Sequence, residues 1–443
     1  MYAAFVVAMI CLAALIAITR VSRHRVVTFL ICAWILASPV FDAHFATIPL
    51  GRLSFDLRME RLLLIALSLY VLLRWTLGRR MYADLTNAPR WVYAGLVYLG
   101  LLALVDVIHL SHELSLREFV INLSIEGTFF VVLLVVAVTA NDRMAKVITQ
   151  SLIVVCVISS AIAIFQFFID PQFFRYGVER PAFAGFVRAN GVFASDHTQA
   201  YWLIAAVNAV LLTVRGRAAR IALVSLFVVG LVLTFHRMSW IVFAVLMLMY
   251  WGRVRKVGFV TWWSAATVVV GLVFVLPATD VVASFARTAF VRERLTQDTG
   301  SYRMLFTVIA VSSVPDHPII GVGSVKSSAY YARVRQEGLS EEEALGEYGG
   351  IHNSYLQLAY LKGVPVALAF LGFLLLAMKD LWRLTPQGSA YGYLELTEVL
   401  KFALGGLTNG LVLGSRIGIL MAILLGVAVA MTQGRRIAPK VVR

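Results

Sequence analysis

The sequence predicts an all-α integral membrane protein with about 12–13 transmembrane helices and one long outer loop that contains short helices. Of its 443 residues, 60% are hydrophobic and only 14% are charged, whereas a soluble domain carries about 25% charged residues. The apolar residues are gathered in blocks, most of them near the roughly 20 residues that a helix needs to cross a bilayer. Because backbone polar groups in lipid must be satisfied internally, blocks of this kind form helices.

We place these blocks along the whole chain and treat residues 1–443 as one polytopic membrane domain. They lie near residues 1–19, 25–42, 59–77, 91–109, 119–140, 145–168, 199–214, 219–235, 238–252, 258–277, 353–378, 399–414 and 417–432. The glycine-rich stretch 403–418 is either one broken helix or the junction of two. Residues 278–352 form the long loop, in which Ser340 and Glu343 fit a capping box that begins a short helix.

The basic residues predict how the helices are oriented. The net charge is +15, but the cations form short clusters between the blocks, as the positive-inside rule requires. This distribution argues against a nucleic-acid partner. The clusters fall in alternate connections: Arg20/Arg23/Arg25, Arg79/Arg80/Arg90, Arg143/Lys146, Arg215/Arg217/Arg220, Arg253/Arg255/Lys256, Lys379/Arg383 and Arg435/Arg436/Lys440. Placing them in the cytoplasm of a bacterium puts the amino terminus outside the inner membrane and the long loop in the periplasm.

Three arginines on the predicted outer side are not explained by that rule. Arg237 lies in LTFHRMSW between two apolar blocks, Arg303 in GSYRMLF within the long loop, and Arg188 in RANGVFASDH ahead of the seventh block. A single arginine at a helix end often only extends toward the membrane surface. Three on one side favour an anionic ligand. Phosphate or pyrophosphate fits best, because a guanidinium forks onto two oxygens.

His352 is a fourth candidate, where the long loop enters the eleventh block in YGGIHNSYLQLAYLKGVP. It either ends the loop while Asn353 or Ser354 caps the helix, or it acts as a general base. An ordinary imidazole pKa of about 6.5 suits proton removal at neutral pH. His236, beside Arg237, is a supporting candidate. The sequence contains no phosphate-binding glycine loop, zinc-ligand spacing or paired-acid motif, so we predict no metal and no cofactor.

Four segments resemble the O-antigen ligase and polymerase superfamily, over roughly residues 185–378. They are LTFHRMSW, GSYRMLF, PIIGVG and HNSYLQLAYLKGVP. Members of this superfamily transfer glycans carried on undecaprenyl pyrophosphate in the periplasmic leaflet. The resemblance therefore implies a membrane glycosyltransferase whose active site faces the periplasm.

The resemblance also implies roles for the candidate residues. Arg237 and Arg303 would hold the pyrophosphate of the donor, and His352 would lie beside the acceptor hydroxyl. The further substrate-binding candidates are Arg188, Asn353 and His236. His236 departs from the pattern, because a small residue such as serine is expected before the arginine.

The leading hypothesis is a ligase that moves O-antigen from undecaprenyl pyrophosphate onto the lipid A core by an inverting, metal-independent single displacement. The closest alternative is a polymerase of the same superfamily that extends a growing glycan. A transporter or flippase is less favoured, because the predicted spans are nearly free of charge at their centres apart from Glu126. The predicted partners are the lipid-linked donor, the acceptor glycan and membrane lipids.

Overall fold

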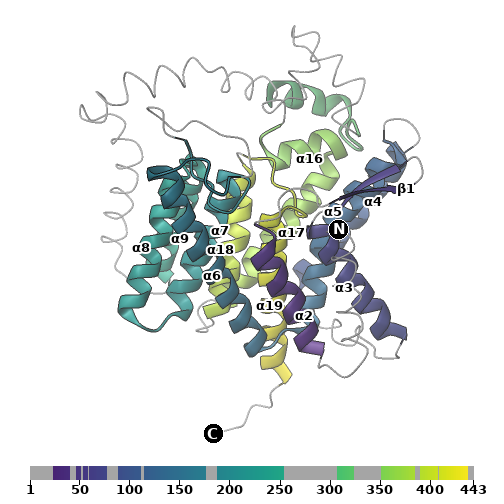
Figure 1. Cartoon of the computed structure of the whole chain (residues 1–443). Helices are drawn as coiled ribbons and strands as arrows, with labels where there is room; N and C mark the ends of the chain where they lie inside the picture. Colours follow the sequence, from purple (N-terminus) through teal and green to yellow (C-terminus); the bar gives the residue numbers. More distant parts are fainter. Residues whose placement is uncertain are drawn as a thin grey trace, which may run out of the picture.

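The chain forms a bundle of helices that run up and down between two ends (Figure 1). The computed structural model describes residues 23–39, 46–50, 53–57, 59–76, 88–110, 114–175, 187–253, 307–323, 351–384, 390–407 and 409–437. The helices are α2 (Arg23–Ala37), α3 (Met59–Thr76), α4 (Arg90–His109), α5 (Leu116–Thr139), α6 (Asp142–Phe168), α7 (Asp196–Thr213), α8 (Arg217–Leu233), α9 (Arg237–Arg253), the 3-10 turn η3 (Val314–Asp316), α16 (Ser354–Lys362), α17 (Val364–Leu384), α18 (Ala390–Gly406) and α19 (Arg416–Ile437). The predicted all-α membrane fold is confirmed.

Four of these helices are long and apolar enough to cross a membrane: α4, α5, α6 and most of α17. Shorter apolar helices lie within α2, α9 and α19. Helices far apart in the sequence pack together, α5 against α19 and α4 against α17, so the amino-terminal and carboxy-terminal parts share one core. The predicted blocks at 1–19 and 258–277 lie outside the described residues, as does most of the long loop 278–352.

One small sheet accompanies the helices. Strands β1 (Ala46–Leu50) and β2 (Leu53–Leu57) form an antiparallel hairpin in which Ala46 pairs with Leu57 and Leu50 with Leu53. The second strand, LSFDL, alternates apolar and polar residues with the period of two that is typical of a half-buried strand. We predicted only a connection here, so the hairpin is an addition to the all-α fold.

The predicted span at residues 353–378 is wrong in one respect, because it is two helices rather than one. α16 ends at Lys362, and Gly363 adopts a φ of 89° that interrupts the helix before α17. Glycine tolerates this left-handed region, whereas other residues are strained there. A Cβ on Gly363 would also lie 2.0 Å from the backbone oxygen of Ile319. The break is therefore required by close packing of a neighbouring segment.

The predicted span at residues 399–414 is displaced. α18 begins at Ala390 and ends at Gly406, and a non-helical stretch leads from there to α19. We call residues 407 and 409–415 the α18–α19 connection. The glycine-rich stretch 403–418 is thus the junction of two helices. Non-helical backbone is tolerated at such a place when it is buried in protein or lines a cavity.

The earlier start of α18 overturns the expectation that Glu126 is the one charge at mid-span. Glu395, Glu398 and Lys401 of α18 are at most 1% exposed, and the Lys401 ammonium forms an ion pair with the Glu398 carboxylate. The carboxylates of Glu395 and Glu398 made the segment AYGYLELTE resemble a polar connection in the sequence. Inside the bundle a buried charge is tolerated when it is paired, and the pairing is invisible in a hydropathy pattern.

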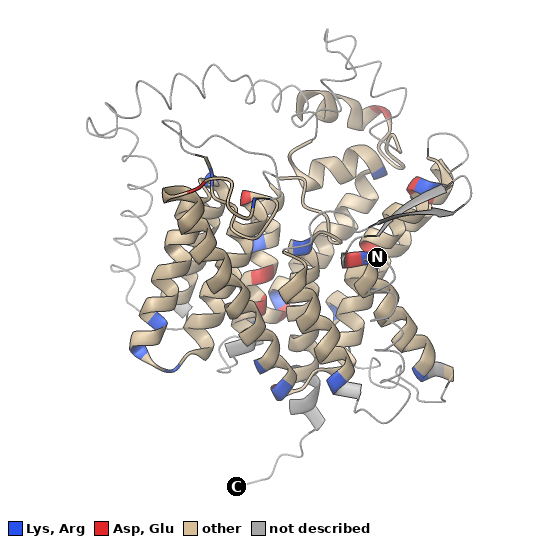
Figure 2. Cartoon of the chain, viewed as in Figure 1, with Lys and Arg blue, Asp and Glu red and all other residues tan. Residues whose placement is uncertain are grey.

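The basic clusters gather at one end of the bundle, which we call the basic end (Figure 2). Because consecutive helices are antiparallel, connections such as α7–α8 and α5–α6 meet at this end with their arginines and lysines. The opposite end, which we call the site end, holds residues 187–195, 234–236, 351–353 and the α18–α19 connection. This separation agrees with the alternation of charge predicted from the sequence.

Candidate active site

The arginines of the site end lie around the first residues of α7 and α9. Arg188 forms an ion pair with Asp196 at 2.8 Å, with side-chain exposures of 14% and 4%. Arg237 begins α9 and is exposed. Arg188 and Arg237 are close enough for their positive charges to repel each other. Two guanidinium groups and one carboxylate leave a net positive charge at this surface, which suits an anionic ligand.

His236 is held beside these arginines by the start of α9. Its Nδ1 lies 2.6 Å from the Ser239 hydroxyl and accepts a hydrogen bond from the Ser239 backbone N–H at 3.3 Å. In the neutral imidazole the proton is then on Nε2, which becomes a donor. The His236 ring lies 6.0 Å from the ring of His197 and 5.9 Å from that of Tyr201. We name these five residues, Arg188, Asp196, His197, His236 and Arg237, the arginine–histidine cluster.

His197 and Asp196 belong to a helix start rather than to the loop in which the sequence pattern placed them. Ser195 caps α7 by accepting from the backbone N–H of Thr198, and its hydroxyl lies 2.6 Å from His197 Nδ1. The sequence analysis assigned no role to His197 or Tyr201. Ser195 and Thr198 before an apolar run indicate the helix cap. Nothing in this local pattern indicates that the His197 imidazole will lie near His236, which directly precedes α9.

The predicted cap at the start of α16 is confirmed for Asn353. Its Oδ1 accepts from the backbone N–H of Tyr355 and Leu356 at 3.0 and 2.9 Å, and its Nδ2 donates to the Leu407 oxygen at 3.1 Å. His352 directly precedes this cap and is half-buried. The amide of Asn353 therefore fixes both the start of α16 and the position of its neighbour His352.

The α18–α19 connection lies between the arginine–histidine cluster and the start of α16. The Ser354 hydroxyl lies 2.8 Å from the Asn409 oxygen and accepts from the Leu411 backbone N–H at 2.8 Å. On the other side, the Tyr201 hydroxyl lies beside the side chains of Asn409 and Ser239. Ser239 also contacts His236. The polar side chains of Ser239, Tyr201 and Asn409 thus lie between the arginine–histidine cluster and the start of α16.

The PIIGVG motif packs backbone to backbone against the end of α16. The N–H groups of Val322 and Gly323 donate to the oxygens of Tyr360 and Leu361 at 2.9 Å each, and the His109 ring lies 2.8 Å from the Ile320 oxygen. Gly321, at a φ of 65°, has no room for a Cβ beside Leu361. Gly321 of PIIGVG and Gly363 at the end of α16 are needed, because the two backbone segments touch here and leave no room for a Cβ.

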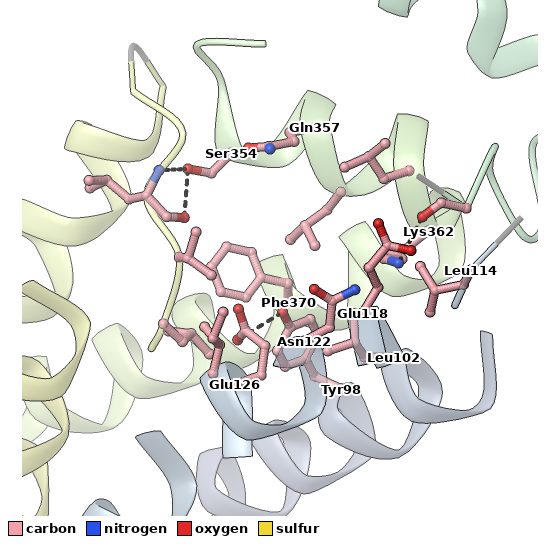
Figure 3. Close-up of a pocket in the computed structure, with 17 residues that line it drawn as sticks. Tyr98, Leu102, Leu114, Glu118, Asn122, Glu126, Ser354, Gln357, Lys362 and Phe370 are labelled. Carbon is pink, nitrogen blue, oxygen red and sulfur yellow. Dashed lines mark hydrogen bonds between the residues drawn. The ribbon is translucent and has the colours of Figure 1, made fainter. Parts of the chain in front are cut away.

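A largely apolar cavity of about 340 Å³, with a few polar side chains in its lining, lies beside α16. Side chains of α16 face those of α4 and α5 across it, and Phe370 of α17 lies between them (Figure 3). Its lining residues are Tyr98, Leu102, Leu114, Glu118, Asn122, Ile125, Glu126, Gly323, Ser354, Gln357, Leu358, Leu361, Lys362, Phe370, Leu411, Val412 and Leu413. Sequence reasoning missed this cavity, because α4 and α5 lie outside the motifs and lend it their side chains only through the fold.

The contacts of the charged lining residues are well defined. Glu126 is 7% exposed and accepts from the Tyr98 hydroxyl at 3.3 Å. Lys362 donates to Asp106 at 2.5 Å and to the Gly323 oxygen at 2.9 Å. Glu118 completes a capping box with Ser115 at the start of α5. The one lysine of the lining is thus neutralised by Asp106, whereas the two glutamates face the cavity.

Arg303, a predicted pyrophosphate ligand, lies outside the described residues. His317, assigned to a turn from its flanking prolines, does lie in one, since its N–H donates to the Val314 oxygen at 3.2 Å. Within the described part of the chain, no three histidine, cysteine or acidic side chains are grouped as metal ligands would be.

Fold and site together define a polytopic membrane protein with two arginines at its surface and a largely apolar cavity at the same end of its bundle. Residues 222–371 match the family described as O-antigen ligase, which confirms the resemblance to the O-antigen ligase and polymerase superfamily. The match includes Arg237, Arg303 and His352, and ends within α17. A comparison with curated proteins gives no match.

Proposed function

We propose that this protein is an O-antigen ligase that transfers a glycan from undecaprenyl pyrophosphate to a hydroxyl of the lipid A core. The transfer takes place in the periplasmic leaflet of the inner membrane. The observation that carries the proposal is the set of polar contacts between the arginine–histidine cluster and the cap of α16. A cationic group for the donor phosphates and an imidazole for the acceptor can then serve one reaction.

The proposed chemistry needs few groups, because pyrophosphate is already a good leaving group. Arg237 and Arg303 bind the pyrophosphate and stabilise the charge that develops as the bond between the anomeric carbon and the phosphate oxygen breaks. His352 accepts the proton of the acceptor hydroxyl as its oxygen attacks that carbon. One glycosidic bond replaces one glycosyl phosphate bond, undecaprenyl pyrophosphate departs, and the anomeric centre is inverted.

The site end also favours catalysis because it can hold the two substrates close together. Both substrates are anchored in the same leaflet, so binding them at one end of the bundle removes much of the entropic barrier to their meeting. Arg188 and His236 are assigned to the donor side with Arg237, and Asn353 to the acceptor side through its hold on α16. No step requires a metal ion.

The test is reconstitution of the full chain in liposomes with an undecaprenyl-pyrophosphate-linked glycan. Two acceptors, lipid A core and a second copy of the donor, are offered in separate reactions. We expect a product on lipid A core, with inverted stereochemistry and an unchanged rate after chelator is added. Product only on the second donor would make the protein a polymerase, the alternative reaction, and a rate abolished by chelator would contradict the metal-independent mechanism.

Gene disruption separates the same alternatives in the cell. Loss of a ligase leaves long polymer on the lipid carrier, whereas loss of a polymerase leaves single repeat units attached to the lipid A core. Transport is tested in the same liposomes. Movement of the lipid-linked glycan across the bilayer without any change in its bonds would overturn the proposal in favour of a flippase.

A further inference from the structure

Two side chains near the end of α4 contact both α16 and the PIIGVG segment. We propose that these residues, Asp106 and His109, are positioning residues of the transfer reaction, which act by fixing α16 and, through it, His352. The inference rests on the proposed transferase function. It adds α4 to the machinery of that function, although α4 lies outside the matched residues 222–371.

The first contact is a buried ion pair. The ammonium of Lys362, the last residue of α16, donates to the Asp106 carboxylate at 2.5 Å and to the Gly323 backbone oxygen at 2.9 Å. Asp106 is 1% exposed and Lys362 is 6% exposed, so water competes little for either charge. One ammonium group therefore ties together α4, α16 and the PIIGVG segment.

The second contact is a hydrogen bond from His109. Its Nε2 lies 2.8 Å from the Ile320 backbone oxygen, and because a carbonyl oxygen only accepts, Nε2 carries the proton. His109 is buried. It follows Asp106 by three positions, so both side chains lie on one face of α4. We call the contacts of Asp106 and His109 with Lys362, Gly323 and Ile320 the α4 joint.

The α4 joint makes α16 a helix that is held at both ends. At its start, Asn353 and Ser354 contact the α18–α19 connection. Lys362 lies at the opposite end of the helix from Ser354 (Figure 3). Nine helical residues span only about 13 Å, so α16 moves as a rigid rod. A shift at Lys362 is therefore transmitted to His352, which directly precedes the cap.

The chemistry of the joint favours positioning over stability. The PIIGVG segment and α16 already pack together through the backbone N–H groups of Val322 and Gly323, which do not involve α4. A buried ion pair adds little net stability, because the cost of desolvation offsets the attraction. What α4 contributes is a fixed place in the bundle for the packed pair. A misplacement of about 1 Å at a reacting group can lower a rate by about 10²-fold.

Asp106→Asn tests the ion pair. Its amide oxygen still accepts from Lys362, but the buried ammonium loses its counter-charge and the joint is loosened. The measurement is kcat per folded protein in liposomes, below the melting temperature, together with equilibrium binding of the lipid-linked donor. We expect kcat to fall by roughly 10- to 100-fold while donor binding is unchanged. Asp142→Asn, which removes an exposed carboxylate from the first turn of α6, is the matched control and should change neither.

The same substitution in a second background shows whether Asp106 acts through His352. Residues that act as one unit are non-additive, so Asp106→Asn should lower the residual rate of His352→Ala by less than about twofold. A loss of full size in that background, or a wild-type kcat in Asp106→Asn alone, would overturn the inference. A wild-type rate in His352→Ala alone would instead contradict the proposed function, so the two failures can be told apart.

His109 gives an independent test that leaves the ion pair intact and applies even where Asp106→Asn does not fold. His109→Gln retains a side-chain N–H for the Ile320 oxygen, whereas His109→Leu does not. We expect a kcat close to that of the wild type for His109→Gln and one lower by roughly tenfold for His109→Leu. Equal kcat values for these two variants would contradict the positioning role.

Discussion

The arginine–histidine cluster and the cavity beside α16 are built in different ways. In the cluster, two arginines and one carboxylate lie at the starts of α7 and α9, near the surface. The cavity is lined mostly by apolar side chains, and its lysine, Lys362, is paired with Asp106. The α18–α19 connection contacts the start of α16 beside this cavity. The difference separates a charged surface, which suits phosphate groups, from an enclosed space that the packing of distant helices creates.

The largest expected effect follows from removing the imidazole of His352. His352→Ala should lower the rate of transfer by about 10³-fold, the scale of a lost general base, while donor and acceptor binding change little. The measurement is the initial rate in liposomes with equilibrium binding of each substrate. His317→Ala is the control, because His317 is an exposed turn residue and its substitution should leave the rate unchanged. Wild-type rates in His352→Ala would remove His352 from the mechanism.

A second effect separates the cluster from the cavity. Arg237→Lys keeps the positive charge but loses the fork that binds two phosphate oxygens, so the rate should fall by about 10²-fold while binding of the acceptor is unchanged. Arg303→Lys should behave in the same way. Arg220→Lys is the control, since Arg220 donates to the Val214 oxygen at the basic end. An equal loss of acceptor binding in Arg237→Lys would show that the cluster does not act on the donor alone.

Sequence reasoning predicted much of the cluster and little of the cavity, for a physical reason. In the cluster, Arg188, His236 and Arg237 were recognisable as polar residues near the ends of apolar blocks, where a charge is costly and therefore informative. The cavity depends on α4 and α5 meeting α16, which lies more than 200 positions away in the chain. Glu126 appeared in the sequence only as an isolated mid-span charge, because no local pattern shows that Tyr98 will donate to it.

The break at Gly363 shows the same limit in the fold. Residues 353–378 are apolar enough overall to be predicted as one long span, although Lys362, Gly363 and Pro365 interrupt the apolar run. The chain breaks because PIIGVG occupies the space that a continuous helix would need. Gly363 could be seen in the sequence as part of a motif. That it makes room for the backbone of Ile319 could not be seen there. In the same way, Glu398 was predicted to lie in a connection, because its ion pair with Lys401 inside the bundle cannot be seen in the sequence.

The smallest expected effect tests whether that break holds the cavity in place. Gly363→Ala puts a Cβ against the Ile319 backbone at a φ of 89°, and should destabilise the protein by about 1–3 kcal/mol. We expect a lower melting temperature in detergent and weaker binding of the acceptor, which is assigned to the α16 side. Binding of the donor should be retained, because the arginine–histidine cluster does not contact this break.

Gly372→Ala is the matched control for that variant. A Cβ at Gly372, within α17, meets nothing within 4 Å, and alanine in a helix is favoured over glycine by roughly 0.5–1 kcal/mol. Its melting temperature should be equal to or above that of the wild type, with both substrates bound normally. If Gly363→Ala instead lost donor and acceptor binding together, the cavity and the cluster would be one cooperative unit. The α18–α19 connection, which holds Ser354 at the start of α16, would then couple the two rather than only lie between them.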